Sequence, residues 1–134
     1  MDKINSTLML KNLVFTNITV KRSVNLIDDV DLNGIFDVTY EELNDNEINV
    51  ILKYEAKTKD DGINIEVELY GNFCIVDQID NKEKRYLLHV NTIAIMYPYL
   101  RSQVSIATTQ PGFMPIQLPI VNAIALAKAA GFVE

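Results

Sequence analysis

With 134 residues, the chain is long enough to bury one modest core, and we expect a single domain over residues 1–134. Its 12 basic and 18 acidic residues give a net charge of −6, which disfavours nucleic-acid phosphate as the main partner. The one cysteine, Cys74, cannot form an internal disulfide. The sequence has neither an apolar run of about 18 residues nor a signal-peptide pattern. We therefore expect a cytoplasmic protein that does not insert directly into membranes.

Alternating apolar and polar residues predict four strands in the first half of the chain, at residues 8–21, 35–43, 48–58 and 63–76. In the first strand, the even-numbered residues from Leu8 to Val20 are expected to form the covered face. In the second strand, Val38 and Tyr40 lie on one face. The Asp-Gly pair at 61–62 suits a hairpin turn between the third and fourth strands. These features predict a four-stranded antiparallel sheet.

Two patterns could suggest a metal site, and neither is complete. The segment from Asp29 to Gly34 matches the first half of a calcium-binding loop, but the twelfth position is Tyr40 where that loop needs a glutamate. His89 is the only histidine, and a lone histidine without other ligands does not make a zinc site. We therefore expect no metal, a solvated acidic turn, and a structural role for His89.

Catalysis is also disfavoured by the sequence. Ser102, Ser105 and Cys74 are potential nucleophiles, but nothing around them resembles a nucleophile elbow or a cysteine-histidine arrangement. The five glycines stand apart from one another, so there is no glycine-rich phosphate loop. The prediction is a protein that is not an enzyme and needs no cofactor.

A polar loop is expected at 77–84, followed by a long helix at about 92–107 that Asn91 or Thr92 caps. Pro98 falls within the helical periodicity, which predicts a bent helix rather than two separate segments. The residues off the main apolar face are also apolar, so a single 134-residue subunit is not expected to cover both sides. The main face is Ile93, Met96, Tyr97, Leu100, Val104 and Ala107, the additional apolar residues are Ile95, Tyr99 and Ile106, and the predicted oligomer interface is Met96, Leu100 and Val104.

The connector after this helix is rich in proline and in large apolar residues. Between residues 110 and 121 it carries Phe113, Met114, Ile116 and Leu118. A small core cannot easily bury all of them, so some are expected to line a groove for a partner. The alternative is that they lie on the sheet or at a subunit contact, and the residues alone leave that choice open. A short helix is expected at 122–130.

Two segments resemble the most characteristic part of the SecB protein-export chaperones. Ile95 to Tyr99 matches the motif that opens the long helix of that family, and Leu118, Pro119 and Asn122 match the turn before its last helix. A weaker similarity is the run from Gly71 to Ile75. The resemblance implies an α+β fold in which a four-stranded antiparallel Greek-key sheet is followed by one long and one short helix. It also implies a homotetramer built as a dimer of dimers.

The function implied by the resemblance is that of an ATP-independent holdase chaperone, which binds unfolded polypeptides through hydrophobic grooves for protein export. The groove residues expected on this basis are Val38, Tyr40, Tyr97, Tyr99, Phe113, Met114, Ile116 and Leu118.

Docking to the SecA translocase motor uses acidic residues of the sheet in this family. Here the first-strand positions are Asn17 and Lys21, and only Glu66 retains an acid. A chaperone of a toxin–antitoxin system that binds an antitoxin is therefore an alternative. A second alternative is an oligomeric structural or assembly protein that binds no client.

Overall fold

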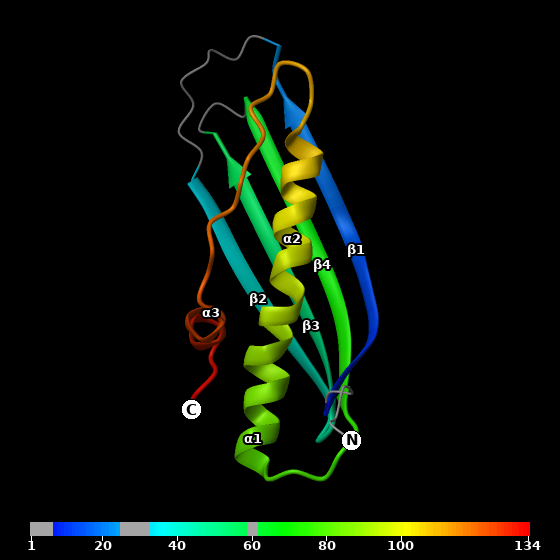
Figure 1. The fold of residues 1–134 in the computed structure, drawn as a ribbon. Helices are drawn as coiled ribbons and strands as arrows, with labels where there is room; N and C mark the ends of the chain where they lie inside the picture. The colour runs from blue at the N-terminus through cyan, green and yellow to red at the C-terminus, as the bar shows by residue number, and fades with distance from the viewer. Residues whose placement is uncertain (1–6, 25–32, 59–61) are drawn as a thin grey trace.

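The structure, a computed structural model, describes residues 7–24, 33–58 and 62–134. It has a four-stranded sheet with helices packed on one face (Figure 1). The strands are β1 (Leu8–Arg22), β2 (Asn33–Asn44), β3 (Glu47–Lys57) and β4 (Ile63–Ile75). Most of the segment weighed as a calcium loop, and most of the predicted turn at 59–62, lie outside the described residues.

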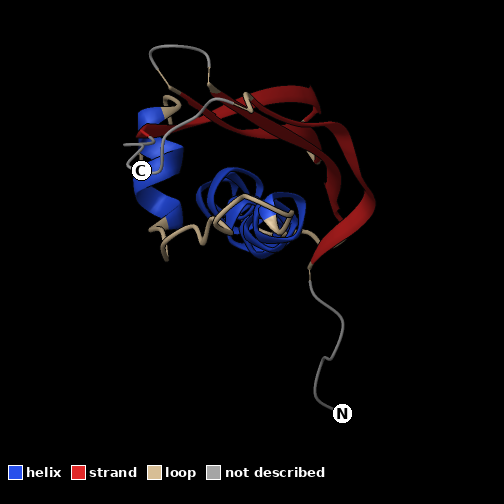
Figure 2. Cartoon of the chain, turned by 90° about the horizontal axis from the view of Figure 1, so that it is seen from above, coloured by secondary structure: helices blue, strands red, loops and turns tan. Residues whose placement is uncertain are grey.

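The sheet has the predicted Greek-key topology. Its strands lie in the order β1-β4-β3-β2, and every neighbouring pair is antiparallel. The last three strands form a meander, and β1 lies beside β4 although the two are far apart in sequence. This order places β3 and β4 at the centre, where Val50, Leu52, Val67 and Leu69 are fully buried. The sheet curves around the long helix (Figure 2).

β1 contains two bulges that change which residues face the core. Its pairing with β4 gains an extra residue at Lys11 and another at Thr16. Between these bulges Leu13 and Phe15 pack against the core, whereas Val14 is exposed. The prediction that even-numbered residues form the covered face is therefore wrong in this part of β1. One inserted residue is enough to move each following side chain to the other face.

A continuous helical run from Asn81 to Thr108 crosses the sheet (Figure 1). Asp80 begins it, because its Oδ1 accepts a hydrogen bond of 2.8 Å from the backbone N–H of Glu83. The run consists of α1 (Asn81–Tyr86), a π-helical segment η1 (Leu87–Asn91) and α2 (Thr92–Thr108). The expectations of a loop up to residue 84 and of a cap at Asn91 or Thr92 are therefore wrong, because the π-helical segment continues the helix through that point.

The long helix and the short helix are both present, as predicted. Pro98 lies inside α2 without ending it. The short helix is α3 (Ala123–Ala129), and Asn122 caps it by accepting hydrogen bonds of 3.0 and 3.2 Å from the backbone N–H groups of Ile124 and Ala125. The architecture is thus the predicted α+β fold, with the sheet first and a long and a short helix after it.

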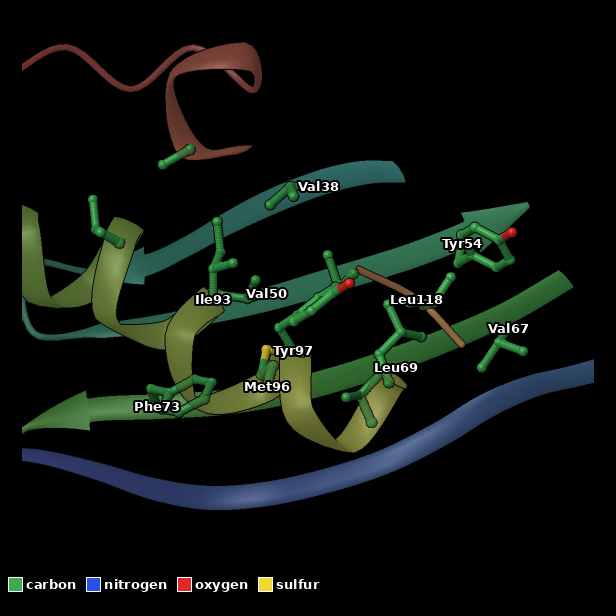
Figure 3. Packing of buried hydrophobic residues seen from close by; sticks show 14 of the residues in the cluster. Val38, Val50, Tyr54, Val67, Leu69, Phe73, Ile93, Met96, Tyr97 and Leu118 are labelled. Atoms are coloured by element: carbon green, nitrogen blue, oxygen red, sulfur yellow. The ribbon is translucent and has the colours of Figure 1, made fainter. Parts of the chain in front are cut away.

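The main apolar face of α2 is the core of its own subunit (Figure 3). Met96, Leu100 and Val104 are fully buried. A glycine makes room for this packing, since a Cβ on Gly71 would lie only 3.0 Å from the sulfur of Met96. The assignment of Met96, Leu100 and Val104 to an oligomer interface is therefore wrong, because a side chain already covered by its own sheet has no surface left for a partner.

His89 has the structural position expected of it. It lies in η1, and its Nε2 is 3.0 Å from Oε1 of Glu42 in β2. Its Nδ1 is 2.9 Å from the carbonyl oxygen of Arg85, and its ring stacks on Phe132 with centroids 5.7 Å apart. The residue therefore joins the second strand, the helical run and the C-terminal segment.

Candidate binding groove

α2 presents three faces, and one of them forms a groove wall. Residues at helical spacing of i, i+4, i+7 and i+11 lie on one side of a helix. Ala94, Pro98, Arg101 and Ser105 have this spacing and line the groove, together with Ser102 at its outer edge. This wall lies between the buried core face and a third, exposed apolar face.

The segment between α2 and α3 runs alongside α2 (Figure 1) and supplies the facing wall. It contributes Gln117, Ile120 and Val121, and Ala123 adds the start of α3. The resulting groove has a volume of about 610 Å³, within the range of roughly 300–1,000 Å³ that is typical of ligand sites. A groove of this size, open to solvent and mostly apolar, can accept a few side chains of another molecule.

Hydrogen bonds hold the facing wall in place. The hydroxyl of Tyr97 donates to the carbonyl oxygen of Pro119. The N–H of Ile116 donates to Oγ1 of Thr108 over 2.8 Å, and Leu118 is buried in the core. The segment is therefore fastened before residue 120, while Ile120 itself is 87% exposed at the groove.

The groove is poor in charge. Of the described residues that line it, only Arg101 carries a formal charge, and neither a histidine nor a carboxylate is among them. The hydroxyls of Ser102 and Ser105 thus have no base beside them there, so the geometry suits binding rather than nucleophilic chemistry. Burial raises the pKa of the Tyr97 hydroxyl, and the nearby charge of Arg101 opposes this rise. A neutral Tyr97 keeps its proton for the hydrogen bond to Pro119.

Only part of the predicted client surface meets at this groove. Tyr97 lines it. Val38 and Leu118 are buried in the core of the chain, so their assignment as client contacts is wrong for the same reason as for the interface residues. Tyr99 projects from a different face of α2 and is 51% exposed.

Two further predicted residues lie elsewhere. Tyr40 is half-buried, and its hydroxyl donates a 2.6 Å hydrogen bond to the carbonyl oxygen of His89; burial raises its pKa. Glu66 lies half-buried in the sheet, paired with Thr19 of β1 and Glu55 of β3. The structure does not bring either residue to the groove, and a docking role for Glu66 stays a prediction.

The connector residues Phe113 and Met114 differ in their surroundings, which leads to a stability prediction. Phe113 is half-buried, with the guanidinium of Arg22 5.7 Å from its ring centroid, whereas Met114 is 85% exposed. Phe113→Ser is expected to lower the free energy of unfolding by about 1–2 kcal/mol, because it loses apolar burial and the cation–π contact. Met114→Ser is the matched control and should change it by less than about 0.5 kcal/mol. Urea titrations followed by circular dichroism measure both, and equal losses would contradict this difference.

Sequence reasoning missed most of the groove wall on α2. The predicted groove residues were apolar or aromatic, whereas this wall consists of small and polar side chains. Its signal was nevertheless present, since Ala94, Pro98, Arg101 and Ser105 share one helical face between two apolar ones. A helical face that is neither apolar nor fully charged is compatible with the wall of a binding site as well as with ordinary surface.

Comparison with known proteins identifies the family. The model of the family described as preprotein translocase subunit SecB matches residues 4–130. The chain belongs to the SecB family. Membership confirms the resemblance found in the sequence and, together with the SecB-like fold, supports a chaperone role.

The individual relatives are distant in sequence. A protein-export protein SecB from Jannaschia sp. is 30% identical over 89 residues, which cover 61% of this chain and 52% of that protein. The uncharacterized protein MJ0357 of Methanocaldococcus jannaschii is 25% identical over 123 residues, covering 82% and 79%. Among solved structures, the Mycobacterium tuberculosis SecB-like chaperone Rv1957, in complex with a ChAD peptide from the HigA1 antitoxin Rv1956, matches with a TM-score of 0.64. The two chains share 13% identity, and the match covers 86% of this chain and 90% of that one.

Two negative findings apply to the described residues. Within the three described stretches, no helix combines the length and the apolar character needed to cross a bilayer. In the same stretches, no three histidine, cysteine, aspartate or glutamate side chains are grouped as metal ligands.

Proposed function

We propose that this SecB-family protein is an ATP-independent holdase chaperone that binds unfolded polypeptide in the groove between α2 and the segment leading to α3. The observation that carries the proposal is the groove of about 610 Å³ with the exposed Ile120 on its wall. Unfolded chains expose apolar side chains that such a groove can cover. A protein that binds the unfolded state opposes folding and aggregation by mass action and needs no nucleotide.

An exposed apolar side chain on the segment between α2 and α3 suits varied clients. Met114 is almost fully exposed, and methionine adapts its shape to different partners at little cost. An apolar area left open to solvent commonly marks an interaction site. These features favour weak, unselective capture over recognition of one fixed partner.

The third face of α2 supports the proposed homotetramer. Ile95, Tyr99 and Ile106 lie along it and are all exposed. Closed symmetry is the commonest way to cover such a face. Several grooves on one assembly would also raise the effective concentration for a long client, so individually weak contacts would suffice. We place this assembly in the cytoplasm.

Two cellular roles are compatible with holdase activity, and the charged residues of the sheet help to distinguish them. Delivery of clients to SecA for export is the role implied by the family. On β1, however, Asn17 and Lys21 stand where acids are expected, and Glu66 and Glu68 are the acids opposite Thr19 and Asn17 on β4. This pattern predicts weak docking to SecA and so favours a second candidate role, binding an antitoxin, as the Rv1957 structure shows for that protein.

Suppression of aggregation tests the proposed function. Ile120→Ser removes an exposed apolar side chain from the groove and should weaken capture of a slowly folding client by roughly tenfold, since burying such a side chain contributes about 1.5 kcal/mol or more. The matched control is Ile35→Ser on β2, which makes the same chemical change at a residue that is 68% exposed and does not line the groove. Light scattering of the diluted client measures both.

The outcomes separate the proposal from its alternatives. Reduced protection by Ile120→Ser alone supports the groove. Equal protection by both variants would show that clients bind elsewhere. A wild-type protein that neither suppresses aggregation nor binds a dye for exposed apolar surface would instead be an oligomeric assembly protein without clients.

A further inference from the structure

Both ring nitrogens of His89 face oxygen atoms that accept hydrogen bonds. Nδ1 lies 2.9 Å from the backbone carbonyl oxygen of Arg85, one turn earlier in the helical run. Nε2 lies 3.0 Å from Oε1 of Glu42 on β2. A neutral imidazole has one donor nitrogen and one acceptor nitrogen. Because Nδ1 donates to the carbonyl group, Nε2 can bond to the carboxylate only when one further proton lies between the two side chains.

The ring of His89 is held in this arrangement from two sides. The residue is 9% exposed, and the hydroxyl of Tyr40 donates to its backbone carbonyl oxygen over 2.6 Å. Burial raises the pKa of Tyr40, so this hydroxyl keeps its proton at neutral pH. Loss of the proton between His89 and Glu42 would place the lone pair of Nε2 against a negative oxygen. The Glu42 side chain is 65% exposed, so it would turn toward solvent and end the link between β2 and the helical run.

The same ring supports the segment that follows α3. Phe132 is buried and stacks on His89 with an angle of 23° between the ring planes, and Tyr86 meets the Phe132 ring edge-on. The backbone N–H of Phe132 donates to the carbonyl oxygen of Ala127 over 2.9 Å, which ties this side chain to α3. α3 begins at Ala123, which lines the groove. The position of the His89 ring therefore fixes α3 and, through it, one end of the groove.

The charged groups around the ring act in opposite directions. Glu42 favours a positive charge on His89, whereas the guanidinium of Arg85 on α1 disfavours it. On the side of α3, Lys128 and Glu134 form an ion pair of 3.2 Å whose charges balance. His89 is the only histidine of the chain, and histidine is the side chain whose charge ordinarily changes between about pH 5 and 8.

We propose that His89 and Glu42 form a proton-dependent latch that holds α3 and the C-terminal segment against β2 and the helical run. A proton bound between the two side chains stabilises the closed arrangement, so the latch is closed at the lower pH and is lost as the pH rises. The inference rests on the proposed function only where it concerns the groove, since a loosened α3 should release clients faster.

Amide hydrogen exchange followed by NMR tests the latch on the full chain. Protection factors of the α3 amides are compared at about pH 6 and about pH 8, with the buried amides of α2 as the internal reference. In the wild type, α3 protection should fall about threefold to fivefold at the higher pH, the loss expected for one partly exposed ion pair, while α2 protection is unchanged. The single imidazole signal should titrate in step with this fall.

Glu42→Gln separates the proton from the contact. The amide N–H of a glutamine can donate to Nε2 of a neutral imidazole. This variant should therefore keep the α3 protection that the wild type has at the lower pH and should lose the pH dependence. The matched control is Glu41→Gln, which removes a carboxylate from the next residue of β2, where the side chain contacts Asn49 instead. It should show the same fall as the wild type.

Three results would overturn the latch. They are α3 protection that does not depend on pH in the wild type, a fall that persists in Glu42→Gln, and a fall that Glu41→Gln also abolishes.

Release of a labelled unfolded peptide that contains no histidine tests the link to the groove. Dissociation should be about threefold faster at the higher pH in the wild type and equal at both pH values in Glu42→Gln. Equal release from the wild type at both pH values would overturn this link. If no peptide binds at all, the proposed function fails, while the amide-exchange result still decides whether the latch exists.

Discussion

Leu100→Asp is expected to unfold the subunit. Leu100 is fully buried between α2 and the sheet. Loss of a buried leucine side chain alone costs about 2–5 kcal/mol, and an unpaired carboxylate in its place adds a desolvation penalty. The sum is comparable with the whole stability of a typical domain, about 5–15 kcal/mol. Thermal and urea denaturation followed by circular dichroism should show a protein that is unfolded or close to it.

The matched control lies on the same helix. Ile106→Asp introduces the same charge at a residue that is 64% exposed, so the subunit fold should survive with a change in the free energy of unfolding of less than about 1 kcal/mol. A folded Leu100→Asp variant that merely fails to assemble would contradict the burial of Leu100. It would restore the sequence-based assignment of this residue to an interface.

The sheet shows what alternation can and cannot predict. The central strands were predictable, because Val50 and Leu52 on β3 and Val67 and Leu69 on β4 repeat with the period of two that a covered face requires. For β1, the sequence predicted that a strand is present but not which of its side chains face the core. Its two bulges at Lys11 and Thr16 reverse the facing of the residues between them, and a bulge leaves no clear mark in the composition of a strand.

The helical run shows a second limit. Apolar periodicity identified α2 and the place of Pro98 within it, but the charged start of α1 looked like a loop. Its residues, such as Glu83 and Lys84, cover no core; the helix there depends on the cap by Asp80 and on continuation through η1. Local polarity therefore predicted a loop where the capping geometry produces a helix.

The sequence predicted where the candidate groove lies but not which residues line it. The proline-rich connector forms one wall of the groove, and Tyr97 lines it. The other expected residues were chosen for apolar character, which does not distinguish a groove from a core: Leu118 is buried and Met114 is exposed within the same segment. Burial depends on how the segment lies across α2, and that depends on long-range contacts such as the bond from Tyr97 to Pro119.

The three faces of α2 have three different roles, whereas a helix with a single apolar stripe has only one buried face. The face with Leu100 builds the subunit core, the face with Arg101 lines the groove, and the face with Tyr99 and Ile106 remains exposed. This division makes the faces open to separate mutation. A change on the third face should leave both the fold and the isolated groove unchanged.

Tyr99→Asp combined with Ile106→Asp is accordingly expected to dissociate the proposed tetramer. The two residues are 51% and 64% exposed on the third face of α2. Placing two carboxylates in an apolar contact costs their desolvation and, across a symmetric interface, brings like charges together. Sedimentation velocity should show smaller species at concentrations where the wild type is a tetramer, with an unchanged circular dichroism spectrum.

The control for this variant places the same charges on other exposed apolar residues. Val24→Asp with Val133→Asp changes two exposed valines that lie off α2, and it should sediment as the wild type does. A monomeric wild type would overturn the tetramer. A tetramer that survives the Tyr99 and Ile106 changes would show that subunits meet through another surface, leaving the third face of α2 free for clients. Aggregation suppression per subunit distinguishes a dissociated protein from an intact tetramer. A dissociated protein loses the linked grooves, so it should bind long clients more weakly while binding short peptides as before.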